Sequence, residues 1–199
     1  MKIIILGGFL GSGKTTALLR FAKYLVDSTV SDKDTKVMIL ENEVGEVGID
    51  DKFLRAGGLS VSNLFSGCAC CTMSGELTSV ASVIQRDYDP EWLVIETTGV
   101  AYPLSMQENL LSALKINARI CVLVDAKRWP RLINAMRGLL AGQIWKSDAV
   151  FINKVDLVDE ETLGEIEADI LELEPNAKIF RISALSEVPD EVWRTAAGV

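Results

Sequence analysis

The feature that most constrains the fold is a glycine-rich stretch at residues 8–15, which reads GFLGSGKT. It fits the pattern G-x-x-x-x-G-K-[ST], whose glycines let successive backbone N–H groups converge on phosphate oxygens at the start of a helix. A continuous apolar run at residues 3–6 precedes it, and apolar residues at helical spacing, Leu18, Phe21 and Leu25, follow it. A chance glycine-rich turn would not carry this context, so we predict a buried strand, a phosphate-binding loop and a helix in that order.

The rest of the chain alternates between short apolar runs and amphipathic segments. Five further runs have the composition of strands buried on both faces, at residues 37–40, 92–95, 120–124, 149–152 and 179–182. Helical spacing recurs in Leu77, Val80 and Ile84, in Leu132, Met136 and Leu139, and in Leu163, Ile166, Ile170 and Leu173. Ser74 is placed to cap the first of these helices. The alternation predicts an α/β fold of the P-loop NTPase type: a doubly wound, mostly parallel sheet with helices on both faces and ligands at the carboxyl ends of the strands.

Length and composition narrow the architecture and the function. The 199 residues contain no internal repeat and no low-complexity linker, so we expect one domain over residues 1–199. With 20 Lys and Arg against 28 Asp and Glu, the net charge of −8 argues against nucleic acid as a main partner. The chain has no histidine, which excludes an imidazole base and a Ser-His-Asp triad. No apolar run approaches the ~20 residues that span a bilayer, so we expect a cytoplasmic protein with no membrane partner.

Polar residues in and near the glycine-rich stretch have expected roles in phosphate chemistry. Lys14 would reach the β- and γ-phosphates, and the Thr15 hydroxyl would hold magnesium. Glu96 ends a buried run, where an acid beside a phosphate-binding loop orders the same magnesium ion; the alternative is that it caps the threonines that follow. Gly99 would let a backbone N–H approach the γ-phosphate. The nucleotide contacts expected from the stretch itself are Gly8, Gly11, Ser12, Gly13, Lys14, Thr15 and Thr16.

The tetrapeptide NKVD at residues 153–156 follows another buried run and predicts guanine recognition. The Asp156 carboxylate can accept hydrogen bonds from both N1–H and the N2 amino group of guanine, a donor pair that adenine lacks. The stem of Lys154 would pack over the base, and Asn153 would brace the loop. As a lone tetrapeptide the pattern is common in turns, and its position at a strand end after a phosphate-binding loop makes it informative.

Two other loops complete the predicted nucleotide site. Ser183 and Ala184 follow the last strand and are expected to add a backbone N–H to guanine O6, although a simple loop explains them equally well. Glu43 begins an irregular, glycine-rich stretch at residues 42–74, and we expect it to position the attacking water or to touch a metal ion. Long irregular segments in compact domains are usually functional.

A cluster of thiols lies in the same stretch, in the sequence GCACC at residues 67–71. Soft thiolates favour zinc, copper(I), cobalt or iron over magnesium, and we expect zinc or cobalt. An extended segment would align Cys68 with Cys70, whereas a helical turn would align Cys68 with Cys71. Two thiolates then leave a tetrahedral ion to be completed by water, a nearby glutamate or a second copy of the chain. The alternative is buried free cysteine, which is what we expect for the isolated Cys121.

Taken together, these motifs resemble those of the CobW-like metallochaperone GTPases, relatives of the urease and hydrogenase nickel-insertion GTPases. The shared elements occur in order at residues 8–16, 43–48, 68–71, 96–99 and 153–156. The resemblance runs from residue 2 to about residue 183 and implies a domain that binds magnesium and GTP. It also implies a nucleotide- or metal-dependent homodimer and a transition metal at the thiols. Tyr102 stands where relatives often carry an acid, and we expect neither a His-rich stretch nor the further C-terminal domain of many relatives.

These features predict a slow GTPase in which Lys14, Glu43 and Glu96 are the catalytic residues. GTP or GDP would govern how firmly the thiol loop holds its metal, for delivery to a metalloenzyme or corrinoid system whose identity the residues do not reveal. Two alternatives remain at this point. The first is a nucleotide-binding metal or redox sensor without turnover, and the second is a P-loop kinase for a small molecule, which would leave Asp156 and the cysteines without a role.

Overall fold

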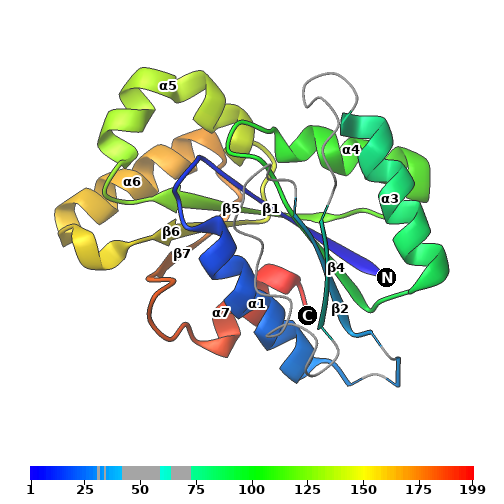
Figure 1. Cartoon of the computed structure of the whole chain (residues 1–199). Helices are drawn as coiled ribbons and strands as arrows, with labels where there is room; N and C mark the ends of the chain where they lie inside the picture. The colour runs from blue at the N-terminus through cyan, green and yellow to red at the C-terminus, as the bar shows by residue number, and fades with distance from the viewer. Residues whose placement is uncertain (31, 34, 42–58, 64–72) are drawn as a thin grey trace.

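A seven-stranded sheet forms the centre of the molecule (Figure 1). The computed structural model describes residues 1–30, 32–33, 35–41, 59–63 and 73–199. The strands are β1 (Lys2–Gly8), β2 (Val37–Glu41), β3 (Leu59–Asn63), β4 (Trp92–Glu96), β5 (Arg119–Asp125), β6 (Ala149–Asn153) and β7 (Lys178–Ile182). Their order is β3-β2-β4-β1-β5-β6-β7, and every strand pairing in the described residues is parallel. This confirms the predicted doubly wound sheet, and all six apolar runs are strands.

Helices cover both faces of the sheet, as Figure 1 shows. They are α1 (Lys14–Ser28), α3 (Met73–Asp87), α4 (Pro103–Leu114), α5 (Trp129–Ile144), α6 (Glu160–Leu173) and α7 (Asp190–Ala197), with a 3-10 turn η1 (Val155–Leu157). One face packs on α1 and α7, where the rings of Phe21 and Trp193 stack with centroids 5.0 Å apart. The other face packs on α3 and α4 over one half of the sheet and on α5 and α6 over the other half. Because both faces are covered, side chains on both sides of the central strands are buried, which explains their continuous apolar runs.

Four details differ from the expectations or extend them. The sequence patterns did not reveal α4 and α7, nor β3, which lies inside the stretch expected to be irregular. Helix α3 begins at Met73, one residue before the serine expected as its cap. Met136 has a non-helical φ of −139° within α5, and this kink shifts the buried side of the helix. Met136 is therefore exposed, contrary to its helical spacing, and Leu140 is buried instead of a continued Leu132–Met136–Leu139 stripe.

The sheet topology gathers polar residues at one edge. Strand β1 lies between β4 and β5, with β2 and β3 beyond β4 and with β6 and β7 beyond β5. The loop after β1 therefore lies where the strand order reverses, which is where open α/β sheets bind ligands. In register, Glu41 of β2 lies beside Glu96 of β4, and Asp125 of β5 lies beside Asn153 of β6. The carboxyl ends of these strands meet the start of α1, and this edge carries the predicted site. None of the helices in the described part of the chain combines the length and apolarity that crossing a bilayer requires.

Candidate functional site

The glycine-rich loop joins β1 to the first turn of α1, where the sequence places it. Gly8, Gly11 and Gly13 all have positive φ, and Gly13, at 95°, precedes the first residue of α1. A side chain there would be strained, and a Cβ would also collide with the Asn153 amide. Lys14, which begins the helix, is only 4% exposed. The loop therefore has the backbone that a phosphate cradle requires, at a helix N-terminus.

Three consecutive carbonyls of this loop accept hydrogen bonds from side chains that follow β5 or that lie at or just after the end of β6. The pairs are Arg128 Nη1 to the Leu10 oxygen at 2.7 Å, Lys154 Nζ to the Gly11 oxygen at 2.7 Å, and Asn153 Nδ2 to the Ser12 oxygen at 2.8 Å. Two of these donors belong to NKVD. The tetrapeptide predicted to recognise guanine and the loop predicted to bind phosphate are therefore one hydrogen-bonded unit.

The position of Lys154 is set by a buried carboxylate that the sequence analysis missed. Asp125, at the end of β5, accepts from Lys154 Nζ at 2.7 Å through one oxygen. Through its other oxygen it accepts from the backbone N–H of Arg128 at 3.2 Å. The signal that would have revealed Asp125 is its place at the end of a buried apolar run, the same criterion that singled out Glu96.

Asn153 joins three segments of the site. Its side-chain oxygen accepts from the backbone N–H of Lys154 at 2.9 Å and of Ala184 at 2.8 Å, while its amide nitrogen bonds the loop at Ser12. Residues 183–184 are thus held against NKVD, and their contact with guanine stays a prediction. The Ala184 N–H is already engaged by Asn153, so a contact to guanine O6 from this segment requires a neighbouring N–H or release of that bond. Asp156 is exposed within η1, one residue beyond the turn's first position.

Thr15 and Glu96 meet at the other side of the loop. The Thr15 hydroxyl donates to Glu96 Oε1 at 3.0 Å, and Glu96 is only 3% exposed. The alternative role for Glu96 is to cap the threonines that follow it, but the Thr97 hydroxyl donates to the Thr98 carbonyl at 3.1 Å. A hydroxyl and a carboxylate are the hard oxygen ligands that magnesium prefers, so the donor set fits that ion. Glu41, beside Glu96 in the sheet register, is a further carboxylate at this edge that the sequence analysis passed over in favour of Glu43.

The segment after β4 packs directly on the phosphate-binding loop. A Cβ on Gly99 would fall 2.7 Å from the backbone nitrogen of Leu10, so only glycine permits this approach. Thr97 anchors the start of the segment through its N–H, which donates to the Leu6 carbonyl at 3.0 Å. The buried Gln143 of α5 donates to the carbonyls of Gly99 and Ala101 at 3.1 and 3.3 Å.

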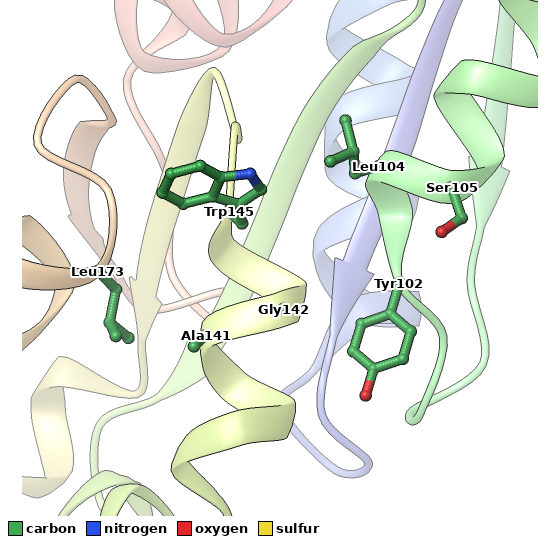
Figure 2. A pocket seen from close by; sticks show the side chains of 7 residues that line it. All are labelled: Tyr102, Leu104, Ser105, Ala141, Gly142, Trp145 and Leu173. Carbon is green, nitrogen blue, oxygen red and sulfur yellow. The ribbon is translucent and has the colours of Figure 1, made fainter.

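A hollow of about 340 Å³ adjoins this segment on its outer side (Figure 2). Tyr102 and the start of α4 form one wall, the end of α5 with Trp145 forms another, and Leu173 of α6 completes it. The Tyr102 ring lies on Gly142, where a Cβ would fall 2.5 Å from the ring atom Cε1. The hollow is thus a surface feature next to the nucleotide edge of the sheet.

The thiol prediction concerns residues outside those that the structure describes. Glu43, Cys68, Cys70 and Cys71 all lie there, and their roles stay predictions. Across residues 1–30, 32–33, 35–41, 59–63 and 73–199, no three His, Cys, Asp or Glu side chains gather in a group that could hold a metal. Cys121 is fully buried in the core, as expected, and burial raises the pKa of its thiol to about 12.

Known proteins resemble this chain in sequence and in fold. It is 27% identical over 231 residues to "Zinc-regulated GTPase metalloprotein activator 1" of Dictyostelium discoideum, covering 95% of this chain and 47% of that protein. It is 28% identical to "Zinc chaperone CobW" of Pseudomonas aeruginosa, covering 92% of this chain and 56% of that protein. The Zn(II)-bound YjiA GTPase of E. coli superposes with a TM-score of 0.68 at 20% identity, covering 100% of this chain and 62% of that one. The chain thus spans about half the length of these curated relatives.

A family model also matches most of the chain. The model described as "CobW/HypB/UreG, nucleotide-binding domain" matches residues 2–181, a range that contains the phosphate-binding loop, Glu96 and NKVD. The fold and the hydrogen-bonded unit of loop and tetrapeptide agree with that description. This protein belongs to the CobW/HypB/UreG family of nucleotide-binding domains.

Proposed function

We propose that this chain binds GTP with magnesium, hydrolyses it slowly, and uses the nucleotide state to control a transition metal held by its thiol loop. The observation that carries the proposal is the link between NKVD and the phosphate-binding loop. Asn153 and Lys154 bond the loop carbonyls of Ser12 and Gly11, so base recognition and phosphate binding share one scaffold. That arrangement suits a protein that reads guanine and triphosphate together.

Phosphate binding falls to the loop and Lys14. Side chains that follow β5 or lie at the end of β6 engage the carbonyls of residues 10–12. The Ser12 N–H donates to the Phe9 carbonyl at 3.1 Å, so we expect the other N–H groups of the loop to bind the anion. Lys14 adds a positive charge at the β- and γ-phosphates. Gly8, Gly11, Ser12, Gly13, Thr15 and Thr16 complete the cradle. The buried Ser12 hydroxyl has no hydrogen-bond partner among the described residues, and a phosphate oxygen would supply one.

Asp156 provides guanine selectivity, and neighbouring side chains position the base. The exposed carboxylate accepts two donors from guanine, and adenine offers no such pair. Lys154, held by Asp125, presents its stem to the base. The segment at Ser183 and Ala184, tied to Asn153, forms the opposite wall.

Hydrolysis takes place at Thr15, Glu96 and Gly99. Thr15 and Glu96 would hold the magnesium ion, whose positive charge would offset that of the phosphates. Gly99 donates its N–H toward the γ-phosphate, and Glu43 orients the attacking water. Lys14 stabilises the charge that develops on the leaving phosphate.

The thiols of Cys68, Cys70 and Cys71 hold the transition metal, and we favour zinc over cobalt. The Dictyostelium and Pseudomonas relatives carry zinc in their names, and the E. coli neighbour was solved with Zn(II). Because the spacing aligns two of these thiols at a time, a tetrahedral ion needs further ligands from water, a nearby glutamate or a second copy of the chain. We favour the second copy, in a nucleotide- or metal-dependent homodimer. The metal is delivered to a client metalloprotein or corrinoid system in the cytoplasm, where thiols stay reduced.

Zinc affinity measured by chelator competition, with a non-hydrolysable GTP analogue and with GDP, tests the coupling. We expect the two affinities to differ by about 5- to 150-fold, the usual range for coupled sites, and zinc to shift the analogue affinity by the same factor. Cys70→Ser should weaken zinc binding, whereas Cys121→Ala, which removes a thiol buried in the core, should not. Equal zinc affinity in both nucleotide states would overturn the coupling.

Phosphate release assays separate the alternatives. A GTPase releases phosphate from GTP without an added acceptor and prefers GTP to ATP. A small-molecule kinase needs an acceptor, and a sensor binds nucleotide and metal without turnover. Either of those results would replace the proposed hydrolysis.

A further inference from the structure

A buried amide on α5 contacts the segment that follows β4. Gln143 is 1% exposed, and the other residues that α5 buries are apolar: Trp129, Leu132, Ile133, Leu140 and Ile144. Burying an amide costs a few kcal/mol unless its polar atoms are hydrogen-bonded. The Gln143 nitrogen meets that requirement by donating to the carbonyls of Gly99 and Ala101.

These two bonds hold the second and the last residue of a tight turn, Gly99 and Ala101. The Ala101 N–H donates to the Thr98 carbonyl at 3.2 Å, which closes the turn around Gly99. The Thr98–Gly99 peptide is trans, so the Gly99 N–H points away from that carbonyl. Gly99 is therefore fixed on three sides: by the turn, by the close approach to Leu10, and by Gln143. Together these contacts limit how the peptide group that carries the Gly99 N–H can rotate.

We propose that Gln143 is a positioning residue for recognition of the γ-phosphate, acting through the orientation of Gly99. This inference rests on the proposed GTP site. It assigns to an α5 side chain the task of presenting a backbone donor to the phosphate that distinguishes GTP from GDP. A donor aimed in advance at developing charge is worth more than one that must reorganise.

The same contact connects the site to the molecular surface. Tyr102 follows the turn and lies on Gly142, the neighbour of Gln143, and Figure 2 shows both beside the hollow that Trp145 borders. Trp145 is 50% exposed, whereas the other three tryptophans are at most 3% exposed. Because Trp145 and Tyr102 line the same hollow, we expect Trp145 emission to respond when the turn shifts, and Trp145→Phe identifies its share of the signal.

The test uses Gln143→Met, which keeps the length of the side chain and removes both donors. Gln143→Leu, which suits the apolar side of α5, is the second variant should the first fail to fold. The matched control is Gln107→Met, because Gln107 makes a similar amide-to-carbonyl bond, to Ala118 at 2.6 Å, before β5 begins and away from the nucleotide edge. Affinities for a non-hydrolysable GTP analogue and for GDP, kcat, and Trp145 emission are measured for each.

We expect Gln143→Met to weaken analogue binding about 10-fold and to lower kcat by 10-fold or more, with GDP affinity within about twofold of the parent protein. The emission difference between the two nucleotide states should shrink in this variant and persist in Gln107→Met. An unchanged ratio of analogue to GDP affinity, or an equal loss for both nucleotides, would overturn the positioning role. A parent protein that binds neither nucleotide would instead refute the proposed function, so the two failures are distinguishable.

Discussion

Thr15 and Glu96 lie 81 positions apart in the chain, yet the threonine hydroxyl donates a 3.0 Å hydrogen bond to the glutamate carboxylate. The pair forms because Thr15 lies in the first turn of α1, which follows the loop after β1, and β4 is the strand paired with β1 on that side. Two oxygen ligands for a hard cation thus meet at the edge of the sheet where the phosphate-binding loop lies.

Removing either oxygen should impair magnesium-dependent hydrolysis. We expect Thr15→Ala and Glu96→Gln each to lower kcat for GTP by ~100-fold, a typical cost of losing one electrostatic contact in a transition state. A magnesium titration of phosphate release measures the effect. Ser82→Ala, which removes a helix hydroxyl bonded to the Thr78 carbonyl, is the control and should match the parent protein. A parent-like magnesium dependence in Thr15→Ala would contradict the assignment.

Replacing the carboxylate of Asp156 with an amide should change which base the protein prefers. Asp156→Asn cannot accept both guanine donors, so we expect GTP affinity to fall roughly 10- to 100-fold. Because the new amide can donate to the 2-carbonyl of xanthine, affinity for xanthosine triphosphate should rise. Competition binding of the two nucleotides measures the switch. Asp159→Asn, three residues on, keeps a good helix cap for α6 and should leave the preference for GTP intact.

Asn153 should matter for folding as well as for binding. Asn153→Ala deletes three hydrogen bonds and leaves the buried groups at Ser12 and Ala184 without that partner. We expect the free energy of unfolding to fall by about 3 kcal/mol in urea titrations. Asn134→Ala removes one exposed side-chain bond to the Pro130 carbonyl and should change it by less than about 0.5 kcal/mol. A similar decrease in unfolding free energy in the two variants would show that Asn153 does not hold the three segments together.

Cys121 should make the protein less stable at alkaline pH. Its thiol has a pKa of about 12 in the folded protein against an ordinary value of 9.0, so above pH 9 the unfolded chain loses the proton and the folded chain keeps it. This contribution is fully present below pH 9 and is lost progressively as the pH rises toward 12. Between pH 8 and pH 10 the parent protein should lose about 1.4 kcal/mol more unfolding free energy than Cys121→Ala.

Urea titrations of both proteins at the two pH values measure that difference, in which the ionisation of other groups cancels. A peptide-mapped alkylation experiment adds a second readout: Cys121 should resist thiol reagents at pH 8 until the protein unfolds. Rapid labelling of Cys121 in the folded protein would contradict its burial.

Much of the fold could be read from local patterns. Six strands were predicted because strands buried on both faces must be continuously apolar, as in Ile120–Val124 within β5. β3 escaped notice because Leu59–Asn63 alternates leucine and valine with serine, a weaker pattern than a continuous run. Met136 misled the helical reading because periodicity assumes an unbroken helix, and the kink in α5 rotates the residues on either side of it.

The amino-acid sequence by itself determined the chemistry of the site: a glycine-rich loop, an acid at a strand end and NKVD are each local patterns, legible because neighbouring residues share one backbone conformation. Only the tertiary structure revealed how these patterns are joined. Arg128 donates to the Leu10 carbonyl across 118 positions, and Lys154 donates to Asp125. Gln143, in the helix that follows β5, donates to the Gly99 carbonyl, which follows β4. Such contacts leave no periodic trace, because their spacing along the chain depends on the order of strands in the sheet rather than on the geometry of any one segment.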